Sequence, residues 1–161
     1  MSAVKIFVGT TIGAGVLWLA YYLNGKKKVG DKLDTVTSAS VHSLQLTGLT
    51  IRIDVILKNP TEYSLTLKQP YVRILFQDKL IGTSQLKDFI IEIPKYGVKA
   101  VDPIFITVPA TGLLTLGNGL FKYLIKKQPA TITTITITSI QVGGKFIGYE
   151  KKDVINLKPK A

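Results

Sequence analysis

The sequence predicts a mainly β protein: a two-sheet antiparallel β-sandwich of about seven strands with one packed α-helix, preceded by a long apolar N-terminal helix. Three observations predict it. Apolar and polar residues alternate over Leu49–Leu57, apolar residues recur at spacings of three and four over Leu113–Ile125, and Ile6–Leu23 contains no charge. At 161 residues the chain is long enough for one domain with a core and an appendage.

The strand pattern is clearest on either side of Asn59-Pro60. Leu49–Leu57 has the period of a half-buried strand, and Tyr71–Phe76 repeats it. A connection must separate them, because proline lacks a backbone N–H and pushes the preceding residue towards extended geometry. The two runs therefore predict an antiparallel unit, and two further breaks follow it, a tight turn at Asp78-Lys79 and a break at Gly82-Thr83-Ser84.

The other expected strands are shorter. Thr131–Val142 alternates less clearly, because its isoleucines change face at the threonines, which predicts bulges or a strand buried on both sides. Gly143-Gly144 predicts a hairpin turn. The remaining strands are expected at His42–Leu46, with a bend at Gly48, and at Phe89–Ile93, Val98–Val101, Ile104–Val108, Lys145–Tyr149 and Val154–Leu157.

One helix is expected over Leu113–Ile125, with an apolar stripe facing the core. Thr111 suits its N-cap, and Pro129 prevents its continuation. Gly117 and Gly119 each cost about 1 kcal/mol against alanine, so packing must hold this helix.

The eighteen uncharged residues of Ile6–Leu23 predict a membrane-spanning helix, because that length crosses most of a hydrocarbon core. Trp18, Tyr21 and Tyr22 lie where an interfacial belt is expected. A cleaved signal peptide and a helix buried in a protein assembly are the alternatives. The basic flank that follows the run suits a stop-transfer signal and contact with headgroups or another polyanion; it consists of Lys26, Lys27 and Lys28.

This flank is more basic than the N-terminal one, so the globular part is expected on the cytoplasmic side. Gly9 and Gly13 form a small-xxx-small pattern through which the chain could self-associate, although glycine is common in membrane helices. The expected organisation is a transmembrane-like helix over 1–25, a basic and polar linker over 26–40 and the β-sandwich over 41–161.

Composition limits the chemistry. There is no cysteine and a single histidine, so thiolate chemistry and His-rich metal sites are excluded. The net charge is +11, and nineteen of the twenty-one basic residues are lysine. Lysine is a hydrated point charge, which suits solubility or general attraction to lipid headgroups or nucleic acid rather than base-specific reading. No catalytic constellation or cofactor motif is found, so neither an enzyme nor a cofactor is expected.

The order of motifs resembles the group-two late-embryogenesis-abundant proteins, which contain the WHy domain. The residues that match are the strand Ile51–Leu57, Asn59-Pro60, a polar spacer ending at Leu65, the strand Tyr71–Phe76, the turn at Gly82 and the strand Ile104–Val108. The resemblance implies a small β-sandwich with one helix and no enzymatic activity, often tethered to a membrane and associated with stress protection, binding or scaffolding.

Two functions are therefore expected. The first is a non-enzymatic, membrane-anchored module that binds or scaffolds other proteins, with membrane lipid, protein subunits and its own copies as partners and non-specific nucleic acid as a weaker candidate. The second is a structural component of a large assembly such as a bacteriophage virion, packed against other subunits or an internal membrane.

Overall fold

The computed structural model describes residues 7–9, 14–16, 32–115 and 119–159. Most of them lie in strands, which confirms the mainly β class. The elements in chain order are β1 Phe7–Gly9, β2 Ala14–Val16, β3 Lys32–Gln45, β4 Gly48–Lys58, β5 Leu65–Lys68, β6 Tyr71–Phe76, β7 Lys79–Thr83, β8 Ile90–Ile93, β9 Val98–Ala100, β10 Ile104–Pro109, α2 Ala110–Thr115, α3 Gly119–Ile125, β11 Ala130–Val142 and β12 Lys145–Lys158.

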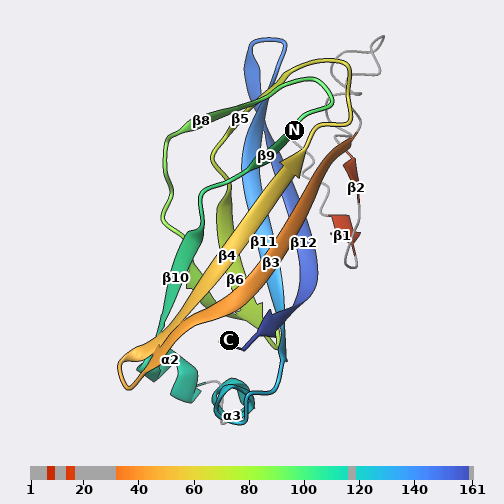
Figure 1. The fold of residues 1–161 in the computed structure, drawn as a ribbon. Helices are drawn as coiled ribbons and strands as arrows, with labels where there is room; N and C mark the ends of the chain where they lie inside the picture. The colour runs from red at the N-terminus through yellow and green to blue at the C-terminus, as the bar shows by residue number, and fades with distance from the viewer. Residues whose placement is uncertain (1–6, 10–13, 17–31, 116–118, 160–161) are drawn as a thin grey trace.

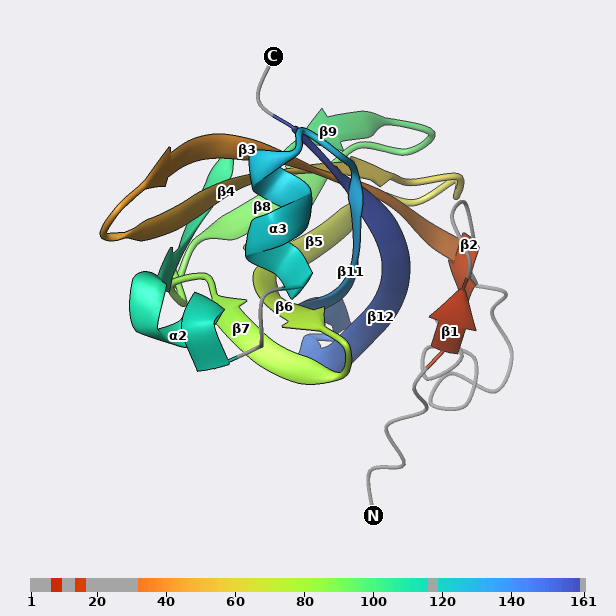
Figure 2. The ribbon, with the colours of Figure 1, turned by 90° about the horizontal axis from the view of Figure 1, so that it is seen from below.

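The described strands form one mixed 12-stranded sheet instead of two clearly separate sheets. Its main path runs β10-β4-β3-β12-β11-β5-β8, and most neighbours are antiparallel. The sheet closes round a core through a short parallel pairing of β3 with β12, at Ala39↔Leu157 and Lys158↔Ser40. Figure 2 shows the strands curling into a ring, with α3 lying across one end of it.

The core is apolar at most levels. The inward residues of β4 are at most 1% exposed, and α2 and α3 close one end of the ring with Leu113, Leu120 and Leu124. The helices therefore depend on packing, as the glycines in this segment required.

The linker expected over 26–40 is wrong for residues 32–40, because they form the first nine residues of the 14-residue strand β3. Its inward positions include Leu33 and Ala39 but also Thr35. A buried face that alternates apolar residues with threonine lacks the hydrophobic contrast by which strands are predicted.

The same reason explains β11 and β12. β11 pairs with β12 without a bulge over thirteen residue pairs, from Ala130↔Leu157 to Val142↔Lys145. Threonines 134, 136 and 138 share its buried face with Ile132 and Ile140, so the strand keeps one phase throughout. The two strands expected at Lys145–Tyr149 and Val154–Leu157 are one continuous strand, β12, turned back at Gly143-Gly144, both at positive φ.

The helix expected over Leu113–Ile125 is divided into α2 and α3. Residues 116–118, which lie outside the described residues, separate them.

The described part of the expected N-terminal helix is strand. Phe7–Gly9 pairs in parallel with residues 151–153 of β12, and Ala14–Val16 pairs with residues 32–34 of β3. The free edges of β3 and β12 satisfy the backbone groups of these short segments, which competes with helix formation. The other residues of Ile6–Leu23 lie outside the described residues. Among the described residues, none of the helices has the length and hydropathy needed to cross a bilayer.

Candidate functional site

Asn59 joins two loops. Its Nδ2 donates to the carbonyls of Tyr63 (2.6 Å) and Pro94 (3.0 Å), and its Oδ1 accepts from the Thr61 N–H (3.1 Å). Its own N–H donates to the Gly97 carbonyl (2.9 Å). A side chain that is 1% exposed and bonded to both the β4–β5 and the β8–β9 connections organises the fold, so it is not a ligand site.

The other motif residues differ in their burial. Leu65 is buried in the core, while Pro60 is exposed at the turn. At Gly82 an added Cβ would lie 2.6 Å from Ile106 Cγ2, so glycine is required for the approach of β7 to β10. The motif that suggested the resemblance therefore determines architecture.

A polar cluster lies on the buried face of β11 and β12. Three successive cross-strand pairs form it, Thr134↔Asp153, Thr136↔Lys151 and Thr138↔Tyr149. Lys151 Nζ donates to the Thr35 carbonyl (2.5 Å) and lies 3.5 Å from Asp153 Oδ1. Sequence reasoning missed this cluster. The threonines of β11 lie opposite Lys151 and Asp153 only in the β11–β12 register, which the sequence alone does not give.

Burial dominates the electrostatics of this cluster. It raises the pKa of Asp153, against the effect of the Lys151 ammonium, and it raises the pKa of Tyr149 to about 12. Among the described residues, Asp153 Oδ2 and the hydroxyls of Thr134 and Thr136 have no hydrogen-bond partner. Among the described residues, no group of three or more His, Cys, Asp or Glu side chains is arranged to hold a metal ion.

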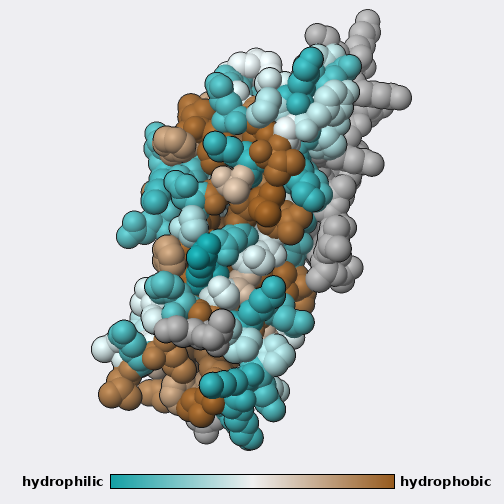
Figure 3. Space-filling model, in the orientation of Figure 1, coloured by the Kyte–Doolittle hydropathy of each residue, from teal (hydrophilic) through white to brown (hydrophobic). Residues whose placement is uncertain are grey.

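Exposed apolar side chains lie at the helical end of the molecule, which we define by the β3–β4 turn, α2 and α3. Leu46 at the turn is 98% exposed, Leu114 of α2 is 73% exposed and Ile125 of α3 is 59% exposed. Between the turn and the helices is a concavity of about 440 Å³, lined by Leu44, Gln45, Leu46, Ala110, Leu113, Leu114 and Phe121. Figure 3 shows apolar side chains gathered at this end, with hydrophilic ones beside them.

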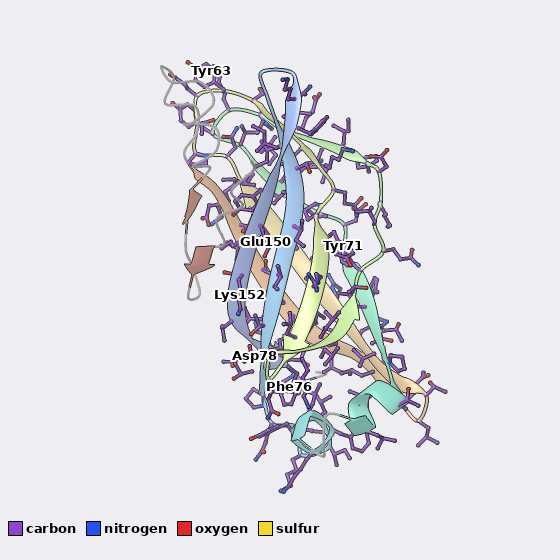
Figure 4. The ribbon with its side chains drawn as sticks, turned by 180° about the vertical axis from the view of Figure 1, so that it is seen from behind. Tyr63, Tyr71, Phe76, Asp78, Glu150 and Lys152 are labelled. Atoms are coloured by element: carbon purple, nitrogen blue, oxygen red, sulfur yellow. The ribbon has the colours of Figure 1, made fainter. Side chains whose placement is uncertain are left out.

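The same end is basic. Asp78 is its one acidic residue among those that the structure describes, and it lies beside α3 with Phe76, at the opposite end from Tyr63 (Figure 4). Gly119 of α3 packs on Phe76, which ties the helix to the β6–β7 turn. The exposed lysines at or next to these elements are Lys79, Lys122, Lys126, Lys127 and Lys158.

Of the residues expected to contact membrane, Gly9 lies in β1. The others lie outside the described residues: Ile6, Gly13, Trp18, Tyr21, Tyr22, Leu23, Lys26, Lys27 and Lys28. The helical end was missed in the sequence, because its apolar residues come from three segments that only the fold brings together.

A scan against protein-family models finds no match, and a search of curated proteins finds none. Among solved structures, a protein from Archaeoglobus fulgidus is similar at a TM-score of 0.51 and 7% identity, over 78% of this chain and 96% of that one. A protein from Arabidopsis thaliana has a TM-score of 0.46 and 18% identity, over 84% of this chain and 93% of that one. A candidate late-embryogenesis-abundant protein has a TM-score of 0.35 and 13% identity, over 89% of this chain and 82% of that one. The first of these likenesses shows a shared fold and nothing of function.

Proposed function

We propose that this protein is a non-enzymatic binding or scaffolding module that is held at a membrane and uses its helical end as the binding surface. One observation supports the proposal: Leu46, Leu114 and Phe121 expose large apolar side chains and line one concavity. Contiguous apolar surface of this kind is characteristic of interaction sites.

We also infer that the domain is of the late-embryogenesis-abundant WHy type. Domains of that type are β-sandwiches. The support is the ordered set of motifs and the role of Asn59, whose bonds to both connections explain why Asn-Pro stands after a hydrophobic strand. The internal polar cluster has no counterpart in those motifs.

The anchor in this proposal is Ile6–Leu23. Its insertion requires β1 and β2 to leave the edges of β12 and β3, where each is paired over three residues only. β3 has 14 residues and spans roughly 45 Å at about 3.3 Å per residue, with Lys32 at one end and the helical end at the other. The anchor and the binding surface therefore belong to opposite ends of the domain.

Membrane fractionation with carbonate washing tests the anchor. The full chain should stay in the pellet, and the double variant Leu17→Arg/Leu19→Arg should be released, because charge in the span is costly. Leu46→Ser is the matched control and should remain in the pellet. Release of the unmodified chain by carbonate would contradict the anchor.

The second candidate is a structural component of a large assembly such as a bacteriophage virion. It is favoured by the edge strand β8 and the residues just before it. Ile90 of β8 is 52% exposed, and Leu86 and Phe89, which precede the strand, are 81% and 62% exposed. An edge strand with exposed apolar residues suits pairing with a second chain. Sedimentation of the full chain distinguishes the candidates: a closed particle whose formation is abolished by Ile90→Lys would support the assembly, and a monomer would count against it.

A further inference from the structure

We propose that the helical end docks on an anionic lipid bilayer. This inference rests on the proposed function, since it names the partner of the same surface. The features that lead to it are the protruding apolar residues, the phase of α3 and the lysines around them.

The apolar residues protrude. Leu46 is at the tip of the two-residue turn between β3 and β4, and Leu114 projects from α2 on the other side of the concavity. Exposures of 98% and 73% place both side chains outside the body of the domain. Side chains in this position can enter the boundary between headgroups and acyl chains without any change in the sheet.

The phase of α3 places the two kinds of residue together. At about 100° per residue, Leu120 and Leu124 face the core, while Phe121 and Ile125 lie together on one flank. Lys122 is then opposite the core, next to Ile125. Tyr123, which is 45% exposed, lies on the opposite flank of α3 and is an amphipathic ring of the kind found at membrane interfaces.

The charges favour lipid over a protein partner. Five exposed lysines and one aspartate give this end an excess of four positive charges. No arginine is among these basic residues. The compact ammonium of lysine attracts headgroups without the geometric demands of an arginine contact. Each lysine near an anionic surface is worth about 1 kcal/mol, which is about a fivefold change in binding.

The position of the anchor is compatible with docking on one bilayer. The eight residues 24–31 reach at most about 28 Å, so the membrane-proximal end of β3 stays near the surface. The helical end reaches the same surface when β3 lies along the bilayer. This orientation also brings the basic flank and the helical lysines to the headgroups together.

The test uses the absence of cysteine from the chain, which allows a single label. An environment-sensitive fluorophore is attached to the full chain at Leu46→Cys, and in a matched sample at Lys145→Cys, beside the β11–β12 turn at the opposite end (Figure 1). Both samples are mixed with phosphatidylcholine vesicles with or without phosphatidylserine. Co-sedimentation with the vesicles is measured in parallel.

The expected result is a blue shift at position 46 only, with vesicles that contain phosphatidylserine. A chain that sediments with vesicles but shows no shift at position 46 overturns this inference and leaves the proposed function standing. A chain that does not sediment with either vesicle overturns both. A shift at position 46 that grows with protein concentration without vesicles assigns the surface to a second copy and also overturns the inference.

Charge variants provide a second measurement. Lys126→Gln/Lys127→Gln should weaken the label's response to phosphatidylserine vesicles about 25-fold, from about fivefold per lysine. The control Lys87→Gln/Lys95→Gln removes two exposed lysines elsewhere and should leave the response unchanged. Equal responses of the two variants would show that overall charge, and not this end, attracts the protein, which contradicts the inference.

Discussion

Lys151 Nζ lies 3.5 Å from Asp153 Oδ1 inside the curled sheet, with the two side chains 4% and 5% exposed. The pair occupies two inward positions of one strand, so it forms part of the core where β3 and β12 diverge. A buried ion pair costs desolvation free energy that its attraction only partly offsets. The pair is therefore a place where sequence changes should raise stability.

Lys151→Met alone should lower the free energy of unfolding by about 3–5 kcal/mol, because it leaves the Asp153 carboxylate buried and uncompensated. The double variant Lys151→Met/Asp153→Leu should recover this loss or exceed the unmodified protein. Urea unfolding followed by circular dichroism measures both. A neutral single variant would show that the pair is solvated.

Tyr149 should make the protein sensitive to alkaline pH. Its pKa is about 12 in the folded state and 10.0 in the reference state, so the unfolded chain loses the proton first. The contribution of Tyr149 to the free energy of unfolding is therefore fully present below pH 10. It is lost as the pH rises towards 12, by about 1.4 kcal/mol per pH unit in that window. Tyr149→Phe should lack this decrease. Urea unfolding of both proteins at pH 9 and pH 11 measures the difference, and parallel decreases would contradict the prediction.

Asn59→Ala should lower the free energy of unfolding by about 3 kcal/mol, because the carbonyls of Tyr63 and Pro94 lose their donor in a buried site. Asn59→Asp should also destabilise, since it keeps the acceptor and loses the donor. The control Glu62→Ala changes an exposed neighbour and should be within 0.5 kcal/mol of the unmodified protein, as surface changes usually are. A stable Asn59→Asp protein would refute the donor role.

Gly82→Ala should cost about 1–3 kcal/mol, because its Cβ would overlap Ile106 Cγ2 at 2.6 Å. Gly148→Ala is the matched control in another strand, since a Cβ there meets nothing within 4 Å. Thermal unfolding of the two variants measures the difference. Equal melting temperatures would mean that β10 shifts to accept the methyl group.

The strands with strong hydrophobic alternation could be predicted from the sequence. Leu49–Leu57, Tyr71–Phe76 and Ile104–Val108 lie within β4, β6 and β10, because leucine and isoleucine on one face leave no doubt about which side is buried. The break at Asn59-Pro60 and the turn at Gly143-Gly144 follow from backbone chemistry that is local to those residues.

Tertiary structure decided the rest. Thr35, Thr134, Thr136 and Lys151 are buried only because neighbouring strands place them opposite one another, and no local pattern marks a polar side chain as internal. The helical end likewise exists only where a turn near residue 46 meets helices that begin at residues 110 and 119. Local sequence determines which segments extend and where they turn, whereas burial and surface depend on contacts between distant segments, which the sequence order alone does not contain.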